Sequence, residues 1–247
     1  MNPLKKTIGT ELLHVGAVLF ALVGTVCAQD LNSRLSKRAT FTPKSAGAFD
    51  QLVEVSQYYQ VPMAIELASD TVMRTSIRAD PAPRGARALL TTILRGCPDC
   101  RMETLEGVVH FYDRRFVADQ RNFLNLRIPD FRVSNASLFD ADASLRLAIK
   151  MLLYPERYAR GWNGGHGSPH TSGFDRTNIT ISGRNLTVRE ILTKIVAGNG
   201  DALWVVRLAP SGTMINERFF AQAYTTPLAQ DDFIWQFIPV ARDPGHK

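Results

Sequence analysis

Residues 177–198 read TNITISGRNLTVREILTKIVAG. Ile179 and Ile181 alternate with polar side chains, which is typical of a short strand. After a polar turn, apolar side chains recur at helical spacing until Gly198, where a glycine is expected to end the helix. The stretch therefore predicts one strand followed by one amphipathic helix.

The same pattern occurs once earlier, in residues 75–96, which read TSIRADPAPRGARALLTTILRG. Without any gap, Ile77 aligns with Ile179 and Gly96 with Gly198, at an offset of 102 residues. We therefore predict an α+β fold in which two small repeated α/β units stand in tandem, each a helix packed on a short mixed sheet.

The rest of the chain is divided around these two stretches. The expected segments are a signal peptide at 1–28, a leader arm at 29–45, a first unit at 46–118, a connector at 119–130 and a second unit at 131–247. The connector is expected to be either an extended linker or an edge strand. A Gly-rich insertion at residues 161–173 replaces a short strand of the first unit and is expected to form a loop.

Periodicity and turn residues place the other elements. Helices are expected from 46 to a stop before Pro62, at 84–95, and from 138 to a stop at Pro155. Strands are expected at 63–67, 75–79, 101–105, 108–112, 202–208 and 214–224, and residues 233–240 are apolar enough to pack back on one of the units. Thr187 and Glu190 have the spacing of a capping box.

The N-terminus has the layout of a secretory signal peptide. Two lysines precede the apolar segment 15–26, and small residues stand before a cut after Ala28. An uncleaved anchor and lipid attachment at Cys27 are the alternatives, but the apolar run is short for a bilayer span. We predict export, cleavage before Gln29, a periplasmic or secreted protein, and no transmembrane helix in the mature chain.

The net charge of +6 is spread along the chain rather than gathered in a patch. A nucleic-acid interface needs a cluster of basic residues, and only short groups such as Arg114-Arg115 occur. We therefore expect no nucleic-acid partner.

Cys97 and Cys100 are the two cysteines that remain after removal of a signal peptide containing Cys27. The C-x-x-C spacing occurs in thiol–disulfide exchange sites, where a helix N-terminus lowers a thiol pKa. Here the pair follows the C-terminal end of its predicted helix, where the dipole disfavours a thiolate. We therefore favour a disulfide that braces the turn between helix and hairpin.

His166 and His170 stand four residues apart in the Gly-rich insertion. That spacing brings two imidazoles together on a helix, but no helix is expected among these glycines, and Asp175 is the only carboxylate close by. No catalytic, cofactor or metal residue is therefore assigned. Long loops on small scaffolds tend to carry recognition. The candidate ligand or partner loop has the residues Trp162, His166, His170 and Phe174.

Residues 49–112 and, more clearly, 179–206 resemble the secretin and TonB short N-terminal (STN) domain. The shared pattern is a strand, a helix with paired apolar residues, a glycine and another strand. The resemblance implies a periplasmic, non-enzymatic domain that binds partner proteins or signals. In receptors and secretins an outer-membrane barrel follows such domains, and we expect none within these 247 residues.

Two functions from different classes follow from these patterns. The first is an exported, non-catalytic binding or adaptor protein whose partner is another exported or envelope protein. The alternative is a secreted, hydrolase-like enzyme with its site under the loop 161–173, which would use His166 or His170 with Asp175.

Overall fold

The computed structural model describes residues 30–45, 47–68, 83–117, 122–153, 155–156, 178–200, 202–208 and 235–239. The predicted α+β class is confirmed, because helices pack on mixed sheets. The predicted signal peptide, the strands at 75–79 and 214–224, and the Gly-rich insertion lie outside these residues.

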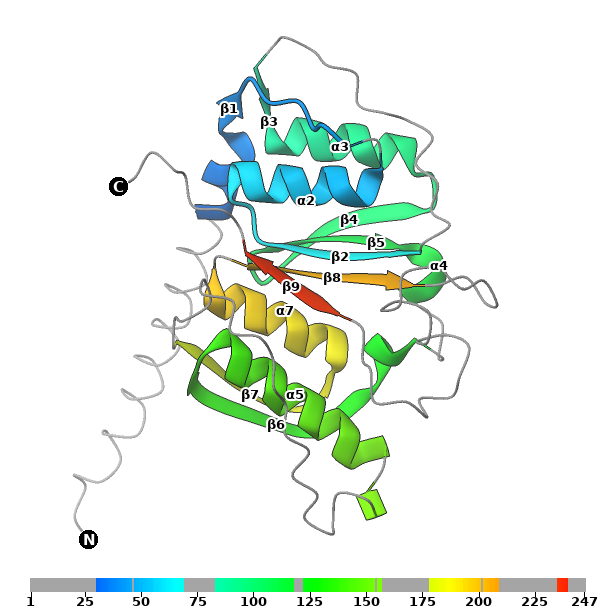
Figure 1. Ribbon diagram of the computed structural model, residues 1–247, viewed down its shortest axis with the longest axis vertical. Helices are drawn as coiled ribbons and strands as arrows, with labels where there is room; N and C mark the ends of the chain where they lie inside the picture. The colour runs from blue at the N-terminus through cyan, green and yellow to red at the C-terminus, as the bar shows by residue number, and fades with distance from the viewer. Residues whose placement is uncertain are drawn as a thin grey trace, which may run out of the picture.

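A five-stranded mixed sheet forms the centre of the protein (Figure 1). In spatial order its strands are β4 (Cys100–Leu105), β5 (Val108–Asp113), β2 (Met63–Ala68), β8 (Ala202–Leu208) and β9 (Gln236–Pro239). The inner strands β5, β2 and β8 are parallel, and the outer strands β4 and β9 are antiparallel to their neighbours. Since β2 comes from the first predicted unit and β8 from the second, the two units share one sheet.

Helices cover both faces of this sheet (Figure 1). On one face, α2 (Ala48–Tyr59) and α3 (Ala86–Gly96) pack on residues such as Ile65 and Phe111. On the other face, α5 (Leu138–Leu153) and α7 (Val188–Asn199) pack on residues such as Ala64 and Trp204. Because side chains of a strand alternate between faces, each inner strand contributes to both cores.

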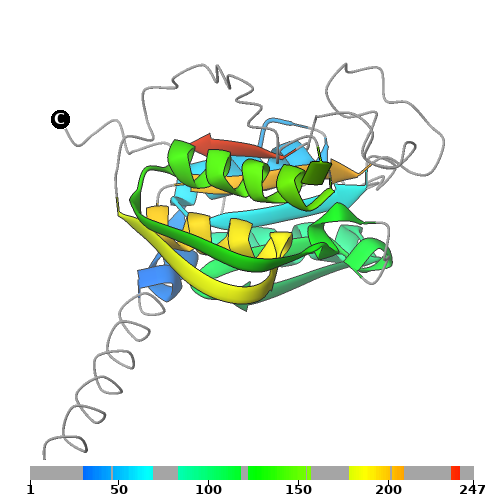
Figure 2. The same ribbon diagram turned by 90° about the horizontal axis from the view of Figure 1, so that it is seen from below.

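Two antiparallel strand pairs lie outside the central sheet. The short pair is β1 (Arg38–Ala39) with β3 (Arg84–Gly85), and the long pair is β6 (Arg127–Ala136) with β7 (Ile179–Thr187). Figure 2 shows β6 and β7 side by side against α5 and α7. The short helices α4 (Arg114–Val117) and η2 (Phe123–Asn125) connect the first half to β6.

The offset of 102 residues seen in the sequence also relates elements of the structure. Helices α3 and α7 begin at Ala86 and Val188, and strands β4 and β8 begin at Cys100 and Ala202. The strand before each helix pairs in the same antiparallel sense, β3 with β1 and β7 with β6. The two halves therefore share a strand–helix–strand core with the same connections.

Local motifs set the ends of several elements as predicted. At the start of α7 the side chain of Thr187 accepts a hydrogen bond from the N–H of Glu190, whose carboxylate accepts one from the N–H of Thr187. Between β4 and β5, Glu106 and Gly107 have φ values of 52° and 77°, as a two-residue type I′ hairpin turn requires. Helix α7 ends at Asn199, and its C-terminal cap Gly200 has a φ of 76°, in the left-handed region.

Three predicted segments need correction. Residues 30–36 of the predicted leader arm are helical, and Leu31 and Leu35, one helical turn apart, are both 4% exposed. In the predicted connector, Phe123–Asn125 forms η2, which neither alternative included, and from Arg127 the chain is strand β6, in line with the edge-strand alternative. The expected polar turn after Ile181 is instead the second part of β7, because β6 pairs with it up to Thr187.

The segment near the C-terminus packs back on the second half, as predicted. Strand β9 pairs with β8, and Trp235 is 3% exposed. Its Nε1 donates to Asp142 Oδ1 at 2.6 Å, and the guanidinium of Arg146 lies 4.1 Å from the ring centroid. Within the described residues, no helix combines the length and the apolar character needed to cross a membrane.

Candidate functional site

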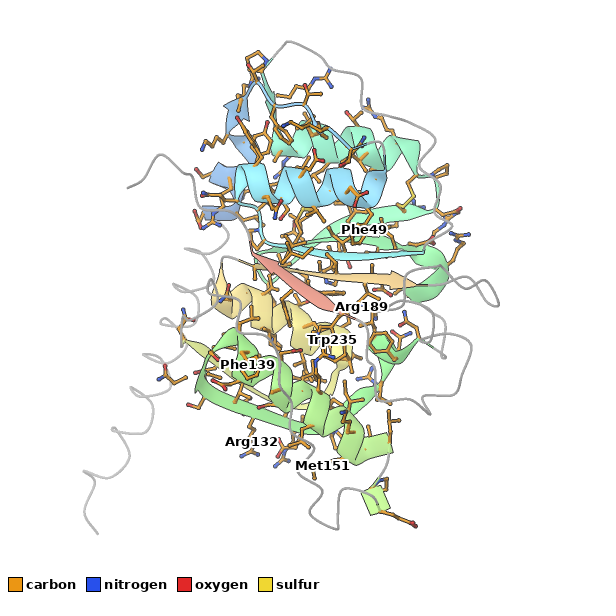
Figure 3. The ribbon with its side chains drawn as sticks, viewed as in Figure 1. Phe49, Arg132, Phe139, Met151, Arg189 and Trp235 are labelled. Atoms are coloured by element: carbon orange, nitrogen blue, oxygen red, sulfur yellow. A yellow bond between two sulfur atoms is a disulfide. The ribbon has the colours of Figure 1, made fainter. Side chains whose placement is uncertain are left out.

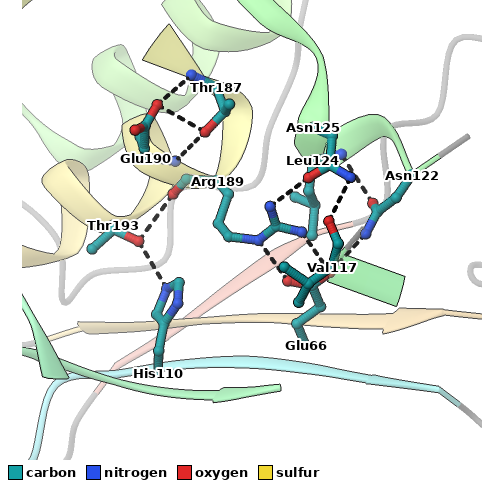
Figure 4. A network of polar contacts seen from close by, with 10 residues as sticks. All are labelled: Glu66, His110, Val117, Asn122, Leu124, Asn125, Thr187, Arg189, Glu190 and Thr193. Carbon is teal, nitrogen blue, oxygen red and sulfur yellow. Dashed lines mark hydrogen bonds and ion pairs between the residues drawn. The ribbon is translucent and has the colours of Figure 1, made fainter. Parts of the chain in front are cut away.

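Glu66 is the one carboxylate in the otherwise apolar strand β2, and it is 1% exposed. Arg189, in the first turn of α7, donates from Nε to Glu66 Oε2 and from Nη2 to Oε1, both at 2.8 Å (Figure 4). This two-fold contact matches the planar guanidinium to the carboxylate. In Figure 3, Arg189 lies on the sheet side of α7, whereas Arg132 lies at the outer side of β6.

Two asparagines, the N-terminal cap and the last residue of η2, complete the surroundings of this ion pair. Asn122 donates from Nδ2 to Glu66 Oε1 at 2.7 Å, and Asn125 accepts from Arg189 Nη1 at 2.6 Å. Asn122 also accepts the N–H of Leu124 at 3.0 Å, which holds it at the start of η2. The buried charges are therefore paired with each other and with amides from a third element.

His110 on β5 and Thr193 on α7 form a second buried polar pair in the same layer, 2.9 Å apart (Figure 4). The hydroxyl of Thr193 donates its proton to the carbonyl oxygen of Arg189 at 2.9 Å. With its one proton on that carbonyl, the hydroxyl accepts from His110 Nε2, an arrangement that corresponds to the Nε2–H tautomer. Burial, with the charge of Arg189, lowers the pKa of His110 from 6.5 to about 4, so the imidazole is neutral at neutral pH.

The chemistry of these polar groups is that of a structural network inside the protein. An activated nucleophile needs a base that accepts its proton, whereas here the histidine donates to the hydroxyl. Thr193 is also 0% exposed, so no substrate reaches it in this conformation. The network joins β2 and β5 of the first half to α7 of the second and to η2.

Two features of the sequence indicate this network. Glu66 interrupts a strand that is otherwise apolar, and a buried carboxylate needs a partner. Arg189 stands in the first turn of a helix, where the dipole disfavours a cation. Each signal indicates a partner of opposite charge, but Glu66 and Arg189 are 123 positions apart, so the sequence alone does not show that they pair.

The predicted cysteine pair lies where the sequence placed it, after the end of α3. Cys97 and Cys100 form a disulfide with Cα atoms 5.2 Å apart, and both residues are buried. Cys97 is the C-terminal cap of α3, and Cys100 is the first residue of β4. The bond therefore fixes the entry of the chain into an outer strand of the sheet.

Strand β4 pairs with β5 on one side, and no described strand pairs with its other side. Val109 stands opposite Thr104 but donates its N–H to Pro62 O, next to β2, at 3.0 Å. Val109 thus directs its backbone groups away from β4. In an antiparallel ladder its opposite residue does the same, so the N–H and C=O of Thr104 face the outside.

The same alternation holds at the other end of β4. Arg114 donates its N–H to Asp99 O at 3.0 Å, so the ladder with β5 uses the odd-numbered residues of this strand. The backbone groups of Met102 consequently also face the outside. We call the outward N–H and C=O groups of Met102 and Thr104 the free edge of β4.

Side chains along this edge alternate between the two faces of the sheet. Met102 packs against the α2/α3 core, whereas Arg101, Glu103 and Leu105 are exposed on the opposite face. Arg101 Nη1 donates to Cys100 O at 2.9 Å. The other outer strand, β9, has four residues and ends in Pro239, which has no N–H to offer. Of the two outer strands, β4 is therefore the longer one, and it contains no proline.

The loop residues predicted from the sequence, Trp162, His166, His170 and Phe174, lie outside the described residues, as does Asp175. Among the residues that the structure describes, no group of three or more His, Cys, Asp or Glu side chains is placed to hold a metal ion.

Comparisons with known proteins give this chain no family. No protein-family model matches it, and neither a curated protein nor a solved structure does. The resemblance to the STN domain stays a prediction from residues 49–112 and 179–206.

Proposed function

We propose that the protein is an exported, non-catalytic binding or adaptor protein that takes up a strand of a partner along the free edge of β4. The single observation that carries the proposal is the outward direction of the Met102 and Thr104 backbone groups on a strand without proline. Addition of a strand to an exposed sheet edge is a common mode of peptide and protein recognition.

The surroundings of β4 support this role. Its first residue is held by the Cys97–Cys100 disulfide, and its last leads into the tight turn at Glu106 and Gly107. Both ends are therefore fixed before a partner binds, which reduces the ordering cost of association.

Two further observations support a binding protein over an enzyme. The buried ionic network has its charges paired internally, and its histidine donates to Thr193 instead of activating it. The signal-peptide pattern in residues 1–28 favours export, and the partner of an exported protein would be another exported or envelope protein.

Replacing Thr104 tests the proposal, because its N–H serves the free edge and not the β4–β5 ladder. Thr104→Pro removes that N–H, and Thr104→Val keeps it with a β-branched side chain. With tagged protein in the exporting cell, we expect Thr104→Val to retain a crosslinked partner and Thr104→Pro to lose it. Equal recovery by both variants, with both folded, contradicts the proposal.

A further inference from the structure

We propose that the strand taken up by the free edge of β4 is β4 of a second copy of this chain, related by a two-fold axis at Met102. The inference rests on the proposed function and names its partner. Pairing two identical antiparallel strands about such an axis gives an isologous interface, in which each contact occurs twice. The central sheet would then continue across the two subunits.

The backbone groups on this edge fit that axis. Met102 N–H meets Met102 O of the partner subunit, and the reverse bond forms by symmetry. Thr104 N–H meets the carbonyl of the partner's Cys100. The N–H of Cys100 is not needed, because it already donates to Cys97 O at 3.0 Å. Four inter-subunit hydrogen bonds result, and each uses a group that faces away from β5.

The charged side chains select this register. With the axis at Met102, Arg101 stands opposite the partner's Glu103, and Glu103 opposite the partner's Arg101. Both residues are exposed on the same face of β4, so two opposite-charge pairs form across the interface. Moving the axis by one residue, to Glu103, places Glu103 opposite its own copy, and like charges directly opposite are unfavourable.

Association exchanges one contact for another at Arg101. In the single chain its Nη1 donates to Cys100 O, which faces away from β5 next to the free edge. In the pair, the guanidinium moves to the carboxylate of the partner's Glu103, and Cys100 O accepts the N–H of the partner's Thr104. On the opposite face the two half-buried Met102 side chains meet, and methionine adapts readily to such a contact.

Charge reversal provides the test, with association of the purified full chain measured by sedimentation over a range of concentrations. We expect wild-type protein to show a monomer–dimer equilibrium. Arg101→Glu and Glu103→Arg each place like charges opposite each other twice and weaken the dimer about tenfold or more. The double variant restores both pairs and returns the dissociation constant to within about threefold of the wild type.

Wild-type protein that stays monomeric, or a double variant no better than the single ones, overturns the inference. If the chain is monomeric but Thr104→Pro still loses a different captured protein, this inference fails and the proposed function stands. If Thr104→Pro changes neither association nor capture, both fail.

Oxidative crosslinking tests the register. Met102→Cys should give a crosslinked dimer and Glu103→Cys should not, and the reverse result contradicts the axis at Met102.

Discussion

Arg189 on α7 donates two hydrogen bonds to Glu66 on β2, and this buried ion pair joins residues that are 123 positions apart. The side chains are 14% and 1% exposed, so water solvates neither charge well. Together with the β2–β8 pairing, the contact makes one structural unit of the two repeated halves. The sheet that presents β4 is held together at this point.

Removal of one partner of this pair should be strongly destabilising. Arg189→Met leaves the Glu66 carboxylate buried without its cation, and we expect a loss of about 3–5 kcal/mol in the free energy of unfolding, measured by urea denaturation. The control is Arg132→Met, which breaks an exposed pair with Asp130 and should change stability by less than about 1 kcal/mol. Equal effects of the two variants would contradict a structural role for the buried Glu66–Arg189 ion pair.

His110 should make stability depend on pH between its two pKa values. Below pH 6.5 the unfolded chain binds a proton at this imidazole, whereas the folded protein binds it only near pH 4. The free energy of unfolding therefore falls as the pH drops through this window, by up to about 3 kcal/mol from this group, and His110 contributes no pH dependence above it. His110→Gln keeps a donor for Thr193, and its stability curve should be flatter from pH 6.5 to 4. Parallel curves for the two proteins would rule out the buried neutral histidine.

The Cys97–Cys100 disulfide should act as a local brace. Closing so short a loop is expected to contribute about 2 kcal/mol. The free energy of unfolding of the double variant Cys97→Ser/Cys100→Ser, measured by urea denaturation, should therefore be lower by that amount. The reduction potential should lie well below that of a dedicated oxidant, because the pair follows a helix C-terminus. A strongly oxidising potential would indicate a redox role instead.

The capping box of α7 gives a conservative pair of variants. Thr187→Ala removes the acceptor for the N–H of Glu190 and should cost about 1 kcal/mol, while Thr187→Ser keeps the hydroxyl and should cost much less. Thermal unfolding of both proteins measures the difference. Similar melting temperatures would mean that the cap adds little to the stability of α7.

Local signals predicted much of this fold. The hairpin at Glu106-Gly107 and the capping box at Thr187 depend on neighbours in the sequence, and each was found. The helix at residues 30–36 was missed because Leu31 and Leu35 are only two apolar positions in a polar stretch. Their burial comes from packing against the α2/α3 core, which local periodicity does not report.

Contacts between the two halves could not be predicted from the sequence. A parallel pairing such as β2 with β8 has no turn to mark it, because the strands are joined through many intervening elements. The Glu66–Arg189 pair has the same difficulty. The free edge of β4 was hidden for a related reason: the sequence predicts the strand, but only the order of strands in the sheet shows that it lies at an edge.

Amide hydrogen exchange at Thr104, in the dilute single chain and in the associated state, tests strand addition most directly. We predict rapid exchange of the Thr104 and Met102 amides in the single chain and slowing of about tenfold or more on association, because each N–H then gains an acceptor. The amide of Glu103, which faces His110 in the ladder, should be protected in both states. Thr104 exchange that is unchanged on association would contradict the central claim.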